Sequence, residues 1–131
     1  MEVREFAFPK TGTLSTPFVA YREMVRRRFP ESLAQSRLDA MTALYLRCAG
    51  YSAKDVDSEM ERHTPAPAND MERRENIRCR QRLLAYAFGT AGDIDIAAVQ
   101  PTLEQIQKYN SEAEQIERDR IEPTQPAFRL R

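Results

Sequence analysis

The sequence has few of the residues that build catalytic and metal sites. It holds one histidine, His63, and two cysteines among 131 residues, with no tryptophan and only four glycines. A Ser/His/Asp or Cys/His arrangement would depend on His63 alone, and neither a second histidine nor a closely spaced cysteine pair completes a metal site. Acids spaced two apart, such as Asp55 and Asp57, point to different faces of a helix. We therefore expect no catalytic residues, no metal, no cofactor and no enzyme activity of this chain on its own.

Long apolar runs and targeting signals are missing as well. No apolar run approaches the roughly 20 residues that a membrane helix needs, and the N-terminal residues show neither a basic nor an apolar region of a signal peptide. Cys48 and Cys79 each fall in a helical apolar pattern, which predicts buried, reduced thiols more than a disulfide. Together these features predict a cytoplasmic protein without membrane contact.

The scarcity of glycine, with frequent Ala, Leu, Arg, Glu and Gln, favours helices over short strands joined by glycine turns. The predicted fold class is all-α: a compact bundle of about five helices with a longer C-terminal amphipathic helix. The predicted organisation is an extended lead-in at residues 1–15, a helix bundle at 16–120 and a flexible, proline-containing tail at 121–131. The aromatic residues of the lead-in, Phe6 and Phe8, can pack on the bundle.

Helix starts are indicated by a capping residue, an acid three residues after it, or a proline at the first helical position. Such signals lie at Thr16 with Pro17, at Ser36 with Asp39, at Ser52 with Asp55, and at Asn69 or Asp70. They predict helices over 16–29, from 36 to Gly50, over 53–62 and over 69–88. Gly89 and Gly92 are expected to break the fourth helix, before a short helix through 93–99 and a longer one after Pro101.

The longer C-terminal helix has a narrow apolar stripe, with spacings of three and four residues. The residues of this stripe are Leu103, Ile106, Ala113 and Ile116. A stripe this narrow is expected to dock only weakly on the bundle. It therefore predicts a surface that binds a partner protein or a second copy of the chain in a homodimer.

Charge is balanced in the sum but uneven along the chain. There are 20 basic and 20 acidic residues, and 17 of the basic ones are arginines, whose planar guanidinium binds phosphate bidentately and stacks on bases. Five arginines and one glutamate lie between residues 73 and 82, and three more arginines occupy 26–28. Eight acids against three basic residues lie between 93 and 122. The molecule is therefore expected to have separate basic and acidic regions.

Arg74, Arg78 and Arg82 follow at i, i+4 and i+8 and form one ridge along a helix, which we call the arginine ridge. Aligned guanidinium groups can follow the phosphates of single-stranded nucleic acid. The predicted nucleic-acid-binding residues are Arg74, Arg78, Arg82, Arg73, Arg27 and Arg28. In the alternative interpretation the ridge pairs with acids of the third or last helix, which would also explain the zero net charge. The two interpretations differ in whether the ridge faces water.

Residues 38–60 have the outline of a helix-turn-helix DNA reader. The second helix of that motif meets phosphates and bases, yet here it carries four acids, Asp55, Asp57, Glu59 and Glu61, against two basic residues. Such a surface repels DNA. A plain helical hairpin is therefore the favoured interpretation.

Two segments, RLDAMTALYLRCAGYSAKDV at 37–56 and RRENIRCRQRLLAYAFGTAGD at 73–93, carry a family resemblance. They resemble the C-terminal helical region of plasmid conjugative relaxases and of relaxase-linked replication primases, over roughly residues 21–110. The second motif is the more specific, because helix-Gly-Tyr-Ser turns occur in many helical proteins. The matching positions are Asp39, Gly50, Tyr51, Ser52, Arg82, Tyr86, Ala87, Phe88, Gly89, Ala91, Gly92 and Asp93.

The resemblance implies a helix bundle outside the nicking and nucleotidyl-transfer centres, which assists priming or transfer by engaging single-stranded DNA or docking the catalytic domain. The sequence lacks the tyrosine and histidine cluster of the relaxase domain and the acidic primase centre, so it would be a detached domain or a stand-alone relative. Implied partners are single-stranded DNA and other plasmid transfer or replication proteins. The alternative is a protein-protein interaction module, a helical adaptor or homodimer, without a nucleic-acid role.

Overall fold

The computed structural model describes residues 14–29 and 34–121, and these residues form six helices and no strand. The helices are α1 (Pro17–Arg28), α2 (Gln35–Cys48), α3 (Ala53–Arg62), α4 (Asp70–Ala87), α5 (Thr90–Val99) and α6 (Leu103–Ile121). The predicted all-α fold class is confirmed. The predicted lead-in up to residue 13 and the tail from 122 lie outside the described residues.

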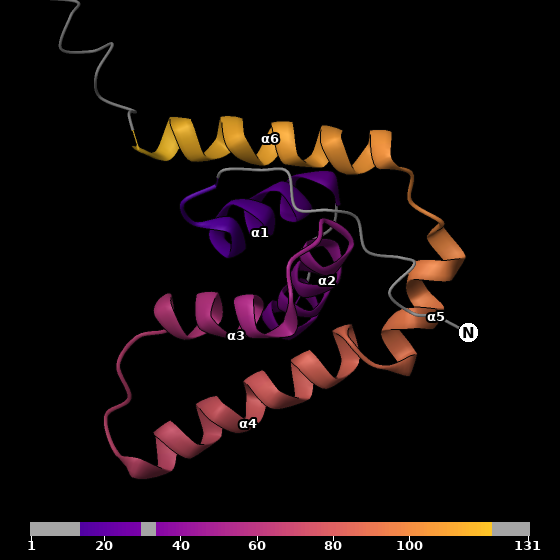
Figure 1. The fold of residues 1–131 in the computed structure, drawn as a ribbon. Coiled ribbons are helices and arrows are strands. Elements are labelled where there is room, and N and C mark those ends of the chain that lie inside the picture. The colour runs from indigo at the N-terminus through magenta and orange to yellow at the C-terminus, as the bar shows by residue number, and fades with distance from the viewer. Residues whose placement is uncertain (1–13, 30–33, 122–131) are drawn as a thin grey trace, which may run out of the picture.

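The bundle is built around the α1–α2 pair (Figure 1). Helix α6 lies along α1 on one side, and α4 packs against α2 and α3 on the other. Figure 1 shows α1, α2 and α3 between α6 and α4, with α5 joining these two outer helices at one end. None of the helices described is both long and apolar enough to cross a membrane.

The core forms where the apolar faces of α1 and α2 meet those of their neighbours. Tyr21, Met24 and Val25 of α1 and Leu46 of α2 have no measurable exposure. Tyr21 packs edge-on against Tyr51 with ring centroids 6.5 Å apart, and its hydroxyl donates to Asn110 Oδ1 of α6. Burial is the main reason that the pKa of Tyr21 is raised. Tyr21 and Tyr51 are thus core residues.

Several predicted helix starts are confirmed. Pro17 lies at the start of α1, and α3 begins with a reciprocal capping box in which the Asp55 backbone donates to Ser52 Oγ at 3.0 Å and the Ser52 backbone donates to Asp55. At α4, Asn69 Oδ1 accepts a hydrogen bond from the backbone of Glu72 at 2.8 Å. These side chains satisfy donors that the first turn of a helix leaves unpaired.

The predicted capping box at Ser36 and Asp39 is wrong. Helix α2 begins one residue earlier, after Ala34, and no side chain caps it. Asp39 instead accepts a hydrogen bond from Gln35 Nε2 at 2.9 Å and lies 3.6 Å from the guanidinium of Arg22 on α1. Arg22 lies on another helix, so spacing along the sequence does not show that it is the neighbour of Asp39.

Two glycines have different roles at helix ends. Gly50 has φ 99°, so it ends α2 in the left-handed conformation that favours glycine, as predicted. Gly92 was expected to break a helix, but it lies inside α5, which begins at Thr90. A Cβ at Gly92 would lie 2.5 Å from the carbonyl oxygens of Tyr86 and Ala87. Glycine at this position therefore permits α5 to pack directly against the end of α4.

A buried arginine joins α2, α4 and α5. Arg47 is 4% exposed, and its guanidinium donates to the carbonyl oxygen of Ala87 at 2.9 Å and pairs with Asp93 at 2.6 Å. It also lies over the Phe88 ring, 5.8 Å from the ring centroid. The residues from Ala87 to Asp93, which the sequence singled out as a motif, thus have a structural role at this helix junction.

The predicted partner-binding stripe on α6 is mostly buried within the chain itself. Ile106, Ala113 and Ile116 are at most 2% exposed, whereas Leu103 is 45% exposed. For the three buried residues the prediction of an open docking surface is wrong in this conformation, and a homodimer through this stripe is not supported. The stripe is narrow because α6 packs mainly along one helix, α1.

The two cysteines differ in environment. Cys48 is buried as predicted, and burial raises its pKa to about 11. Cys79 is exposed on α4, so the prediction that it is buried is wrong. Cys79 lines an open cleft between α4 and the rest of the bundle, and a helical apolar pattern cannot reveal such a cleft.

Candidate nucleic-acid interface

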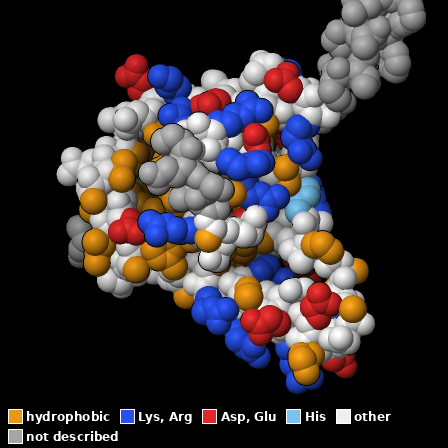
Figure 2. Space-filling model, turned by 180° about the vertical axis from the view of Figure 1, so that it is seen from behind, with side chains coloured by type: hydrophobic (Ala, Val, Ile, Leu, Met, Phe, Trp, Pro, Cys, Tyr) orange, Lys and Arg blue, Asp and Glu red, His pale blue; other side chains and the backbone are white. Residues whose placement is uncertain are grey.

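Helix α4 is largely exposed. Ala87 is its only buried residue, while Met71 near its start is 77% exposed. Figure 2 shows basic side chains, interspersed with acids, along the lower part of the molecule where α4 projects. The helix therefore presents most of its surface to solvent.

Opposite faces of α4 have different partners. Asn76, Arg80 and Leu83, at helical spacing, face α1 and α3 across a cleft. Arg80 Nε donates to Asp57 of α3 at 2.8 Å. Two residues advance a helix by about 200°, so Arg78 lies about 160° around α4 from Arg80. The arginine ridge is thus on the face that turns away from the bundle.

All three ridge arginines are exposed. Arg78 pairs with Glu75 one turn earlier on the same helix, and Arg82 lies 3.5 Å from the sulfur of Cys79. Among the residues that the structure describes, neither Arg74 nor Arg82 pairs with a carboxylate. The ridge therefore faces water, and neutralisation by the acids of α6 or α3 does not occur.

The other predicted contacts are partly engaged. Arg73 is exposed and pairs with Asp70 at the start of α4. Arg27 pairs with Glu23 at 3.0 Å on α1. Arg28 is used at the α1–α6 contact, where it pairs with Glu112 at 2.6 Å and lies 4.5 Å from the centroid of the Tyr109 ring. Binding of DNA by Arg28 would require these contacts to break.

A cleft between α4 and the α1–α3 part of the bundle extends the polar surface inward. Its volume is about 150 Å³, and Arg22, His63, Asn76 and Arg80 are among the residues that line it. Arg22 also lies 5.4 Å from the ring centroid of Phe18. The sequence does not point to Arg22 or Arg80 as a pair, because no spacing rule joins residues of α1 to residues of α4.

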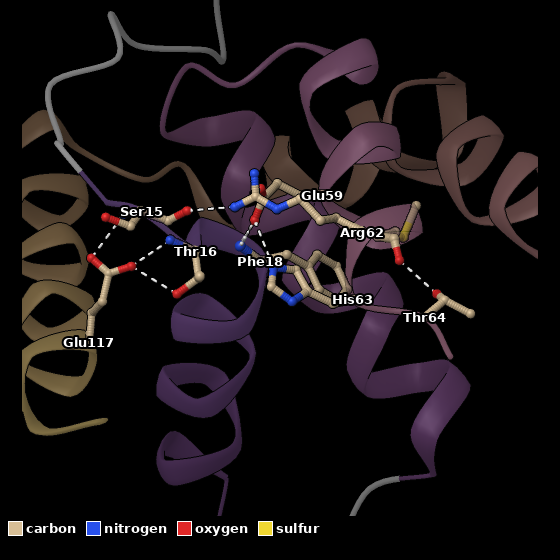
Figure 3. A network of polar contacts seen from close by, with 9 residues as sticks. Ser15, Thr16, Phe18, Glu59, Arg62, His63, Thr64 and Glu117 are labelled. Carbon is tan, nitrogen blue, oxygen red and sulfur yellow. Dashed lines mark hydrogen bonds and ion pairs between the residues drawn. The ribbon is translucent and has the colours of Figure 1, made fainter. Parts of the chain in front are cut away.

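The first turn of α1 receives acidic partners from two other helices (Figure 3). The Ser15 backbone donates to Glu117 of α6 at 3.0 Å, and the Thr16 backbone and hydroxyl donate to the same carboxylate, the hydroxyl at 2.8 Å. The Phe18 backbone donates to Glu59 of α3 at 3.2 Å. Carboxylates at a helix N-terminus are favoured by its unpaired N–H groups and its dipole.

These capping acids were missed by the sequence analysis. The sequence gives only an indirect signal for them. Helix α1 has no acid in its own first turn, and Pro17 has no N–H, so any acid that caps α1 has to come from another helix. Burial alone would raise the pKa of Glu117, but the hydrogen bonds from Ser15 and Thr16 outweigh it and lower the pKa. Glu117 and Glu59 thus join the start of α1 to α6 and to α3.

His63 follows the last turn of α3, and its Nε2 lies 3.6 Å from Glu59 Oε1. Within 14–29 and 34–121, no three His, Cys, Asp or Glu side chains are grouped so that they could hold a metal ion.

Comparison with known families identifies a related segment. Residues 34–78, about a third of the chain, match the family model of the RepB DNA-primase C-terminal helical domain. The match runs from the start of α2 into α4 and includes Arg73, Arg74 and Arg78. This segment is thus similar to a helical domain of a replication primase. Searches of the curated proteins and of the solved structures gave no match.

The match supports the primase part of the resemblance seen in the sequence. It includes the first motif, at 37–56, and ends before Arg82, so most of the second and more specific motif lies beyond it. The relaxase part of the resemblance gains no support from this comparison and stays a prediction.

Proposed function

We propose that the chain is a non-catalytic accessory domain of a DNA-priming protein and that it binds single-stranded DNA through the arginine ridge of α4. The observation that carries the proposal is the exposure of Arg74, Arg78 and Arg82 on the face of α4 that turns away from the bundle. The similarity of residues 34–78 to a primase helical domain supports the same function.

The geometry of the ridge suits a phosphate backbone. Residues four apart on a helix rise about 6 Å along its axis, so Arg74, Arg78 and Arg82 offer three guanidinium groups along about 12 Å. Guanidinium groups bind phosphate oxygens in pairs and release counterions when they do so. Arg74 and Arg82 have no carboxylate partner to lose within the described part of the chain, so binding costs them no ion pair.

Duplex binding in the helix-turn-helix manner does not fit the described helices. The helix that would enter the major groove in a helix-turn-helix protein is α3, and its acids Asp57 and Glu59 are engaged with Arg80 and with the start of α1. Tyr21 and Tyr51 are buried and cannot stack on bases. Binding is therefore expected to depend on phosphates and to tolerate different base sequences.

Catalysis is assigned to another part of the priming machinery. A role that fits this chain is to hold template near a catalytic domain, in the cytoplasm, where plasmid replication or transfer takes place. Docking of the catalytic domain itself is the alternative role, and it would not require the arginine ridge to contact DNA.

The test is fluorescence anisotropy with a labelled single-stranded oligonucleotide at low salt. We expect Arg74→Glu with Arg82→Glu to weaken binding by about tenfold or more, because two phosphate contacts become repulsive. The matched control is Arg118→Glu with Arg120→Glu, which makes the same charge change at exposed positions of α6. Equal losses of DNA affinity in both variants would show that binding depends only on the net charge of the chain. An absence of binding by the unmodified chain would overturn the proposal.

A further inference from the structure

An open apolar groove runs between α2 and α5 and reaches the end of α4. Its volume is about 450 Å³, within the range of about 300–1,000 Å³ that is usual for pockets that hold small molecules. Met41 and Tyr45 of α2, Val99 of α5, Tyr86 of α4 and Phe29 are among the residues that line it. Figure 2 shows hydrophobic side chains gathered on the edge of the molecule that α5 forms. Three helices thus contribute to one apolar surface.

The walls of the groove are incompletely covered. Val99 is 67% exposed, and Tyr45 and Tyr86 are only partly buried although they pack against the core. Arg37 and Asp95 form a polar rim. An exposed apolar surface with a polar rim is typical of a binding site.

Tyr86 joins this groove to the arginine ridge. It follows Arg82 by four residues on α4, which is the spacing that also separates Arg74, Arg78 and Arg82. Each such step rises about 6 Å along the helix and turns by about 40°, so the line through the three arginines continues onto Tyr86. A strand that follows the ridge toward the C-terminal end of α4 therefore arrives at the groove.

We propose that the groove binds bases of the same single strand whose phosphates follow the arginine ridge, an inference that rests on the proposed binding of single-stranded DNA by that ridge. A base has two flat faces and a polar edge. One face can stack on the ring of Tyr86 while the base packs against Val99 and Tyr45. Stacking on aromatic side chains tolerates every base, which agrees with the expected tolerance of different base sequences.

The polar rim suits a base better than it suits an aliphatic side chain of a protein. The Tyr86 hydroxyl donates a hydrogen bond to Asp95. Burial is the main cause that raises the pKa of Tyr86 to about 12, and the nearby positive charge of Arg37 opposes this rise. Arg37 offers donors for the carbonyl groups of a base, and Asp95 accepts from its amino groups. The occupant that fits has both a flat face and a hydrogen-bonding edge.

Labelled oligothymidine and an abasic strand of the same length test the inference by fluorescence anisotropy with the full chain at low salt. Both strands carry the same phosphates, so the arginine ridge binds both. We expect oligothymidine to bind about tenfold more tightly, and Tyr86→Ala to bring its affinity close to that of the abasic strand. Equal affinities of the unmodified chain for the two strands would overturn this inference and leave the arginine ridge as the DNA-binding surface. An absence of binding to either strand would overturn both proposals.

A matched pair of variants on α5 tests the groove without a change to Tyr86. Val99 is 67% exposed and lines the groove, whereas Ile94 is 63% exposed and does not line it. Val99→Glu places a carboxylate where a base would bind, so it should abolish most of the preference for oligothymidine over the abasic strand. Ile94→Glu makes the same change in net charge and should keep that preference. An equal preference in the two variants, as expected if the groove binds a protein partner, would overturn the inference.

Discussion

The α1–α6 side and the α4 side of the bundle carry the same kinds of charged residue but use them differently. On α6, Glu112 pairs with Arg28 and Glu117 caps α1, so its acids bind this chain's own helices. On α4, Arg74 and Arg82 point away from the bundle and pair with no carboxylate among the described residues. A net charge of zero thus conceals one set of charges that stabilises the fold and another that is available to a partner.

This difference separates arginines that hold helices together from arginines that are exposed to solvent. Arg47 is buried against Ala87, Asp93 and Phe88, and Arg28 joins α1 to α6, so a contribution to stability explains both arginines. Stability does not explain the arginine ridge, because exposed charges away from such contacts contribute little to folding. Substitutions in the two sets should therefore affect different measurements.

The largest effect on stability is expected at Arg47. Its replacement in Arg47→Ala would leave Asp93 without its cation and the Ala87 carbonyl without its donor, which should lower the free energy of unfolding by about 3 to 5 kcal/mol. Urea denaturation measures this change. Arg118→Ala, at an exposed arginine of α6, serves as the control and should change stability by less than about 0.5 kcal/mol. Similar losses of unfolding free energy in the two variants would mean that the buried Arg47 contributes no more to stability than an exposed arginine.

The next largest effect is expected for the apolar stripe of α6. Ile116→Ala removes a side chain that is 2% exposed and should cost about 3 kcal/mol of unfolding free energy, whereas Leu103→Ala, at a residue 45% exposed, should cost under about 1 kcal/mol. The same denaturation experiment measures both. If Ile116→Ala left stability unchanged, α6 would be a free helix and its stripe a docking surface after all.

A smaller, pH-dependent effect is expected at Glu117. Glu117→Gln keeps the shape but removes the charge that caps α1, and it should cost about 1 kcal/mol at pH 7. Because the folded pKa is lowered, the stabilisation is complete above the ordinary glutamate pKa of 4.5 and is lost as the pH falls through the lowered value. The two proteins should therefore converge in Tm at low pH.

The control for this prediction is Glu61→Gln, at an exposed glutamate of α3. Its difference from the unmodified chain should stay small at every pH. A gap between Glu117→Gln and the unmodified chain that persists at pH 3 would show that packing, and not charge, is responsible.

The smallest effect on stability is expected for the arginine ridge. Arg74→Glu with Arg82→Glu should change the free energy of unfolding by no more than about 0.5 kcal/mol for each residue, since neither guanidinium holds another element. Thermal unfolding measures it. A loss as large as that of Ile116→Ala would mean that the ridge is part of the fold.

Local rules predicted much of this fold. The caps at Ser52 and Asn69, Pro17 at the start of α1 and the left-handed Gly50 all follow from chemistry within a few residues. The errors arose where distant segments meet. Gly92 lies inside a helix because the end of α4 comes too close there for a side chain. Ile116 is buried because α1 covers it. Such contacts join residues far apart in the chain, which no local pattern records.

The candidate interface was predictable only in part. Spacing along one helix placed Arg74, Arg78 and Arg82 on one face, but it could not show whether that face turns to water or to the acidic helices. The structure shows that it turns to water. The pairing of Arg80 with Asp57, and the presence of Arg22 in the adjacent cleft, depend on how four helices pack.

The most direct test of the central claim is the salt dependence of single-stranded DNA binding. Each phosphate neutralised on a single strand contributes about −0.7 to the slope of log affinity against log salt concentration, so three ridge contacts should give a slope of about −2. Arg74→Glu with Arg82→Glu should bring the slope to about −0.7, the contribution of Arg78 alone, while Arg118→Glu with Arg120→Glu should leave it near −2. A slope that is the same in all three proteins would contradict the assignment of the arginine ridge as the DNA-binding surface.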